Sequence, residues 1–289
     1  ILNRCDFSLS FEVFPPKTDT SFDSVQAAVR EIAKLRPPFM SVTYGAGGGR
    51  SRYTLEIAEE IKQNYGVESL AHLTCISSTH EDVHKEIESI QNAGIENIMA
   101  LRGDVPPGME QEDRSGWAYH HAVELIREIK EFAPDMCIGG ACYPEVHPES
   151  VNQKEDIRYL KEKIEAGCDF LTTQMFFDNN LLYNFLYKIR EAGITVPVVA
   201  GIMPITNANQ VERAVKLSGS FMPQRFKALV DTFGSDPAAM CEAGIAYATD
   251  QIIDLFANNV TNVHVYSMNK PMVAQKIQSN LSAILGKTI

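Results

Sequence analysis

Eight apolar, β-rich runs recur along the chain at fairly regular intervals, and this repeat limits the folds that the sequence can adopt. Segments with helical periodicity lie between the runs, for example around Val25, Val29 and Ile32. Each connection is too long for a hairpin, so the pattern predicts parallel βαβ units. The runs are SLSFEVF (8–14), FMSVTYG (39–45), SLAHLTCIS (69–77), NIMALRGD (97–104), CIGGACYP (137–144), FLTTQMFFD (170–178), VPVVAGIMPIT (196–206) and NVHVYSMN (262–269).

Eight strand–helix repeats in 289 residues predict an α/β fold, a (β/α)8 TIM barrel. The helical stretch at about 224–258 predicts extra helices between the seventh and eighth strands. We expect residues 1–289 to form a single catalytic barrel domain, and a doubly wound open sheet is the structural alternative. In such barrels the active site lies at the carboxyl ends of the strands, so polar residues there are the first candidates.

The composition of the chain limits which partners it can bind and in which compartment it is expected. The net charge of −11 argues against a general surface for nucleic acid or anionic membranes. No apolar run reaches the length of about 18 residues that a membrane span needs. The six cysteines are scattered and form no CxxC motif, which is typical of reduced thiols. We therefore expect a cytoplasmic protein that binds neither nucleic acid nor membrane.

Glu12 is the anomalous residue of the first run. Leu9, Phe11 and Val13 share one face of the predicted strand, whereas Glu12 stands on the other face near its carboxyl end. A carboxylate is costly to bury without a partner. It therefore forms an ion pair with a lysine or arginine, or it acts as a general acid whose pKa is raised by desolvation.

Other strand ends carry candidate ligand contacts. The loop TYGAGGGRSRYT (43–54) matches neither the GxGxxG nor the P-loop pattern. It is either a flexible turn or a segment whose glycines let the backbone come close to a flat or anionic ligand. Asp104, in LRGDVPPG, caps its loop or contacts a ligand. Gln174 has both a donor and an acceptor, which suits a heterocycle edge as well as a satisfied core amide.

Two further patterns lie on predicted helices. Asp156, Tyr159 and Lys163 share one helix edge, which is either a solvated face or a contact for the ribose or phosphate of a ligand. The segment HEDVH (80–84) matches the zinc-protease pattern H-E-x-x-H. Thr79 is the expected N-cap of that helix, and no third ligand is recognisable, so His80 and His84 are interpreted as surface residues with no metal.

Taken together, the strand-end motifs resemble those of the methylenetetrahydrofolate reductase family in its bacterial catalytic form. The resemblance runs through essentially the whole chain in the family's order. It implies FAD-dependent reduction of 5,10-methylenetetrahydrofolate to 5-methyltetrahydrofolate, with NADH or NADPH reducing the flavin in a ping-pong scheme. The motifs are FEVFPPK, SVTYGAGG, AHLTC, LRGDVPPG, YPEVHPE, TQMFFD, GIMPITN and VHVYSMN.

The resemblance also implies roles for individual residues. Glu12 matches the catalytic glutamate that helps protonate the folate amine N10, and Asp104 matches an aspartate that contacts the pterin and influences the flavin. Gln174 and Gln210 match folate contacts, and Gln174 also matches a nicotinamide contact. The implied cofactor-binding positions are Thr43 (for nicotinamide), Tyr44, Ala46, His72, Arg102, Gly103, Asp104, Tyr143, His147, Asp156, Tyr159 and Lys163.

Lys270 is a departure from the family pattern. Many relatives read TLNR after the eighth strand, whereas this chain reads Ser267-Met268-Asn269-Lys270. Lysine attracts the carboxylates of the folate tail but cannot form a bidentate fork. The sequence does not distinguish NADH from NADPH. One alternative is the same folate reduction with electrons from an iron–sulfur partner protein. The other, from a different class, is a zinc hydrolase that uses His80 and His84. We also expect the protein to form a homo-oligomer.

Overall fold

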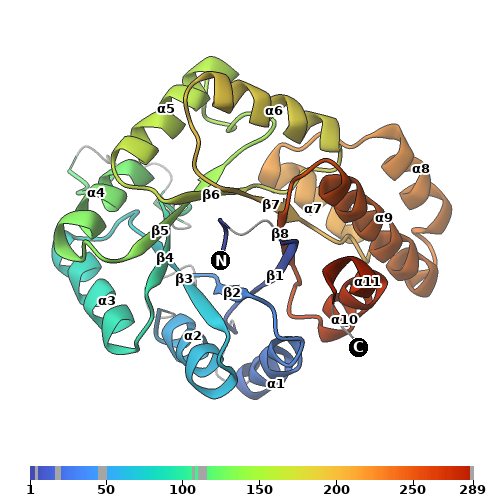
Figure 1. Ribbon diagram of the computed structural model, residues 1–289, viewed down its shortest axis with the longest axis horizontal. Coiled ribbons are helices and arrows are strands. Elements are labelled where there is room, and N and C mark those ends of the chain that lie inside the picture. Colours follow the sequence, from blue (N-terminus) through green and yellow to red (C-terminus); the bar gives the residue numbers. More distant parts are fainter. Residues whose placement is uncertain (4–5, 17–20, 45–50, 106–107, 110–115, 287–289) are drawn as a thin grey trace. The chain divides into compact units, whose positions relative to one another are not determined.

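The computed structural model describes residues 1–3, 6–16, 21–44, 51–105, 108–109 and 116–286. Eight strands in these ranges are hydrogen-bonded in sequence order as a closed barrel, and helices alternate with them (Figure 1). The predicted (β/α)8 TIM barrel is therefore confirmed. The strands are β1 (Ser8–Val13), β2 (Phe39–Val42), β3 (Glu68–Thr74), β4 (Asn97–Leu101), β5 (Cys137–Cys142), β6 (Phe170–Thr173), β7 (Val198–Ile202) and β8 (Asn262–Tyr266).

The helices follow the strands in the expected order. The predicted extra helical stretch between β7 and β8 is confirmed, and it consists of two helices, α8 and α9. They separate because Asp236 caps the amide groups of Ala238 and Ala239, and Pro237 begins the new helix. The helices are α1 (Phe22–Ala33), α2 (Ser51–Tyr65), α3 (His80–Asn92), α4 (Ala122–Phe132), α5 (Gln153–Glu165), α6 (Asn179–Glu191), α7 (Asn209–Ser218), α8 (Gln224–Phe233), α9 (Pro237–Ala257), α10 (Pro271–Asn280) and α11 (Ser282–Leu285).

Several strands end earlier than their apolar runs do. The fourth run was expected to extend to residue 104, but β4 ends at Leu101, and Gly103 then adopts a φ of +87°. The sixth run was expected to extend to residue 178, but β6 ends at Thr173. The polar residues of these motifs therefore lie in the loops that follow the strands. In a loop, the direction of a side chain is not set by the two-residue alternation of a strand.

The chain divides into two compact units, and unit 2 comprises residues 12–141 and 162–171. Strands β2, β3 and β4 pair in parallel here, with Phe39 opposite Glu68 and Ala71 opposite Ile98. Helix α2 packs on β2 and β3, and α4 packs on β4 (Figure 1). Val83, Ile87 and Ile90 of α3 are buried, as their helical spacing predicts.

Unit 1 comprises residues 1–11, 142–161 and 172–289. Strands β7 and β8 pair in parallel, and α8 and α10 both pack against α9. Phe177, Ile205, Phe226 of α8 and Met240 of α9 belong to one buried hydrophobic cluster. No helix in the described ranges has both the length and the apolar character that crossing a membrane requires.

Candidate functional site

Glu12 lies near the carboxyl end of β1, as expected, and its side chain is 20% exposed. The Ser41 hydroxyl donates to Glu12 Oε2 at 3.5 Å. Burial raises the pKa of Glu12 from 4.5 to about 8, and the hydrogen bond from Ser41 lowers it slightly. The carboxyl group is therefore mostly protonated at neutral pH, which is the state that a general acid needs.

His72 of β3 is the second titratable group beside Glu12. Its side chain is almost completely buried, and burial lowers its pKa to about 4. His72 Nε2 lies 3.7 Å from Glu12 Oε2, which is too far for a hydrogen bond. Because both groups are uncharged at neutral pH, we do not interpret this contact as an ion pair. An imidazole with a pKa of about 4 is too weak a base to remove the Glu12 proton.

Thr43 and Tyr44 follow β2. The Thr43 amide donates to the Val13 carbonyl at 3.0 Å, and the Thr54 hydroxyl donates to the Thr43 carbonyl at 2.9 Å. These bonds fix the backbone at the start of the glycine-rich loop, and Tyr44 is half-buried. Ala46, with the glycines of that loop, lies outside the described residues.

Arg102, Gly103 and Asp104 lie in the irregular segment that follows β4. The Arg102 carbonyl accepts from the Ile76 amide at 2.8 Å, and Arg102 Nε donates to the Gly103 carbonyl at 3.2 Å. Gly103 has a φ of +87°, and a Cβ atom there would lie 2.9 Å from the Thr74 Cβ. Only glycine fits this position without strain. Asp104 is exposed, so it is accessible to a ligand.

The loop after β5 and helix α5 place four predicted cofactor residues of unit 1. Asp156 is buried, and its carboxylate accepts from the His147 amide at 3.1 Å and from the Ser150 hydroxyl at 3.3 Å. The Tyr143 and His147 rings meet edge to face at 4.5 Å. Tyr159 is exposed. The solvated-face interpretation of this helix edge is therefore wrong for Asp156, because the loop folds over its carboxylate.

Lys163 also belongs to α5, but it lies in unit 2. Its ammonium group donates to the Ala141 carbonyl at 3.0 Å. Unlike the long cations of a solvated helix face, it is held at the end of β5 by a backbone acceptor.

The predicted folate contacts of unit 1 have fixed amide orientations. Gln174 Oε1 accepts from the Met175 amide at 2.9 Å. Gln210 Oε1 accepts from the Thr206 amide at 3.1 Å, and the Thr206 hydroxyl accepts from Lys270 Nζ at 2.8 Å. The Gln210 oxygen is engaged twice by Thr206, so its –NH2 group is the part available to a ligand. The Gln174 oxygen is engaged once, so Gln174 keeps one acceptor site besides its –NH2 group.

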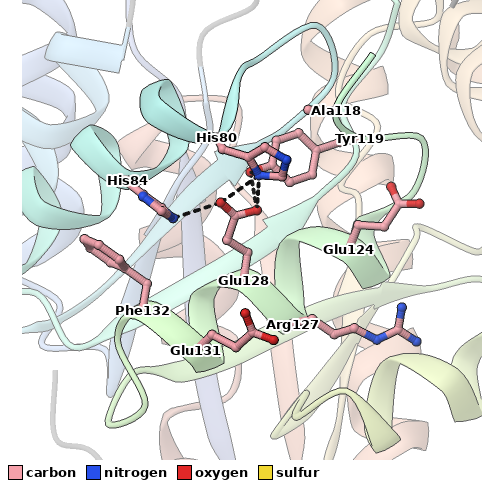
Figure 2. A pocket seen from close by; sticks show the side chains of 9 residues that line it. All are labelled: His80, His84, Ala118, Tyr119, Glu124, Arg127, Glu128, Glu131 and Phe132. Carbon is pink, nitrogen blue, oxygen red and sulfur yellow. Dashed lines mark hydrogen bonds and ion pairs between the residues drawn. The ribbon is translucent and has the colours of Figure 1, made fainter. Parts of the chain in front are cut away.

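The HEDVH segment forms part of an open pocket of about 540 Å³ between α3 and α4. Figure 2 shows His80 and His84 pointing at one carboxylate, that of Glu128 on α4. The shortest nitrogen–oxygen distances are 2.8 Å for His80 and 2.9 Å for His84. The buried phenol of Tyr119 also donates to Glu128. Within the ranges that the structure describes, no three His, Cys, Asp or Glu side chains are arranged to hold a metal ion. The cluster therefore joins α3 to α4 and gives the zinc-hydrolase hypothesis no support.

Sequence reasoning named Glu12, His72, Gln210 and Lys270 as site residues but did not name the residues that contact some of them. Ser41 could have been found, because it stands two residues before Thr43 on the strand that neighbours Glu12. Thr206 stands in the strand-end motif GIMPITN and four residues before Gln210, so it could also have been considered. Glu128 carried no signal, because its histidine partners lie on another helix.

The fold defines a class of protein, the (β/α)8 barrels, and this one carries a carboxyl group, that of Glu12, near the carboxyl end of its first strand. The model of the family "Methylenetetrahydrofolate reductase" matches residues 1–282. The 5,10-methylenetetrahydrofolate reductase of Escherichia coli (strain K12) is 34% identical over 93% of this chain and 89% of its own length. The chain therefore belongs to the methylenetetrahydrofolate reductase family.

Two other similar proteins add context. Methylenetetrahydrofolate reductase (NADH) 1 of Arabidopsis thaliana is 32% identical over 96% of this chain, which spans about half (48%) of that relative's length. An uncharacterized protein from Clostridium thermocellum, described as binding two copies of 5-methyl-5,6,7,8-tetrahydrofolic acid, has a TM-score of 0.65. It is 13% identical and covers 99% of this chain and 97% of its own, so it supports the fold alone.

Proposed function

We propose that this chain reduces 5,10-methylenetetrahydrofolate to 5-methyltetrahydrofolate, with FAD as cofactor and a nicotinamide nucleotide as electron donor in a ping-pong scheme. The observation that carries the proposal is Glu12, a largely buried carboxyl group near the end of β1 with a pKa raised to about 8. The names of the plant relatives specify NADH, so NADH is the donor to test first.

The residues described around the strand ends fit FAD by their chemistry. Arg102 and Lys163 are cations held by the Gly103 and Ala141 carbonyls, and they suit phosphate oxygens. The buried Asp156 carboxylate suits a ribose hydroxyl or an adenine amine. We propose that these residues, with Thr43, Tyr44, His72, Gly103, Asp104, Tyr143, His147 and Tyr159, hold the cofactor and the nicotinamide in turn. FAD, when bound, accepts a hydride from the nicotinamide nucleotide and passes it to the substrate.

The chain's own acid chemistry centres on Glu12. Its proton is retained at neutral pH because ionisation in a buried position is costly. We propose that Glu12 donates this proton to the N10 amine of the folate, which opens the five-membered ring to an electrophilic iminium. His72, with its pKa lowered to about 4, is too weak a base to compete for the proton. Asp104, Gln174 and Gln210 orient the substrate.

Anaerobic assay of product formation tests the proposal. The purified protein is supplied with FAD, NADH and 5,10-methylenetetrahydrofolate, and 5-methyltetrahydrofolate is quantified by chromatography. We expect product with NADH or NADPH and a loss of at least about 100-fold in Glu12→Gln, because a positioned acid contributes factors of this size. Product only with a reduced iron–sulfur carrier would refute the nicotinamide assignment. A cytoplasmic location and a homo-oligomer stay predictions.

A further inference from the structure

Thr206 joins two residues that come from different strand ends of unit 1. It lies after β7 and is 7% exposed. Its hydroxyl accepts from Lys270 Nζ at 2.8 Å and lies 3.5 Å from Gln210 Oε1, to which its hydrogen can be donated. Its backbone amide donates to the same Gln210 oxygen at 3.1 Å. One buried residue therefore orients both a lysine and a glutamine.

This arrangement leaves only hydrogen-bond donors for a ligand. A lysine ammonium group has three N–H donors, and Thr206 engages one of those of Lys270. Gln210 has its oxygen engaged by Thr206, so its –NH2 group is left for a ligand. Both side chains are half-buried rather than fully solvated. A cation beside an amide donor recognises an anionic acceptor such as a carboxylate.

We propose that Thr206 is a positioning residue that aims Lys270 and Gln210 at the glutamate-tail carboxylates of the folate. The inference rests on the proposed function for the identity of the ligand. Lysine has a flexible four-carbon stem and no rigid fork, so its point charge needs an anchor to hold one direction. The Thr206 hydroxyl is that anchor, and it is held in place by the burial of its own side chain.

The positioning can be tested without any folate, by acylating lysines of the purified holoprotein at low occupancy and quantifying Lys270 by mass spectrometry. Thr206→Val keeps the backbone amide but removes the hydroxyl. We expect labelling of Lys270 to rise about five-fold in Thr206→Val, the factor that loss of one hydrogen bond corresponds to, and to stay unchanged in Thr206→Ser. Equal labelling of Lys270 in the wild type and Thr206→Val would overturn the positioning role.

The ligand assignment is tested separately by titrating the holoprotein with 5-methyltetrahydrofolate and with the matching pteroate that lacks the glutamate tail. We expect Thr206→Val to weaken binding of the tailed compound about five-fold and to leave the tail-less compound unchanged, with Thr206→Ser restoring the wild-type value. Thr249→Val, which removes another buried hydroxyl from unit 1, is the control and should match the wild type. Equal weakening of both compounds would refute tail recognition. A wild-type protein that binds neither compound would refute the proposed function, while the labelling result would still decide the role of Thr206.

Discussion

Replacing Glu12 by glutamine should stabilise the fold at alkaline pH, because the wild-type carboxyl group must ionise in a buried position. Its pKa of about 8 in the folded state lies above its ordinary value of 4.5. The folded protein therefore binds more protons than the unfolded chain between these two values, and its stability falls as pH rises from about 4.5 to about 8. At 1.36 kcal/mol per pKa unit the difference amounts to roughly 5 kcal/mol.

The amide of Glu12→Gln is neutral at every pH, so the variant lacks this loss. Urea unfolding of both proteins, at equal cofactor loading, should show a stability difference in favour of the variant that grows by about 2 to 5 kcal/mol between pH 5 and pH 9. Glu131→Gln on the exposed face of α4 removes the same charge and is the control. A difference that is constant with pH, or that grows toward acid pH, would refute the assignment of a raised pKa to Glu12.

Three further predictions follow from local geometry. Gly103→Ala should lower the free energy of unfolding by about 2–3 kcal/mol in a urea titration, because the added Cβ would collide with Thr74. Gly94→Ala is the control: Gly94 also has a positive φ but has open space around it, so the loss should be about 1 kcal/mol. Equal losses in the two variants would contradict this reasoning. Ser41→Ala should move the alkaline limb of the pH–rate profile for folate reduction to higher pH by a fraction of a unit, because it removes a donor that favours the charged form of Glu12; a shift to lower pH would count against this. Glu128→Gln should destabilise the fold by about 1–3 kcal/mol, because it replaces one of the two oxygens that accept from His80, His84 and Tyr119 with an –NH2 group. Unchanged urea unfolding would mean that the cluster does not join α3 to α4.

The barrel could be predicted from the sequence because its signals are local and repeated. Buried strands appear as short apolar runs, and the helices between them bury one face, as Val83, Ile87 and Ile90 do in α3. The anomaly at Glu12 was also visible, since period-two alternation places the carboxylate in a strand that is otherwise buried.

The carboxyl ends of the strands could not be placed in the same way. β4 ends at Leu101 and β6 ends at Thr173, and both ends lie within the runs that the sequence shows. The backbone turns away from the sheet near Gly103 and before Gln174, but the residue types do not change at these points, so the sequence pattern does not mark the strand ends. Periodicity also does not show which distant residues are partners, as the hydrogen bond from Lys270 to Thr206 illustrates. The neutral state of His72 required its burial to be known.

Anaerobic stopped-flow absorbance of the FAD-loaded protein tests the central claim most directly, because it observes the two half-reactions separately. We expect NADH or NADPH to bleach the flavin absorbance and 5,10-methylenetetrahydrofolate to restore it. In Glu12→Gln the bleaching should persist, and the recovery of colour with the folate should be slowed by at least about 100-fold. Recovery at the wild-type rate in Glu12→Gln, or no recovery in the wild-type protein, would contradict the account.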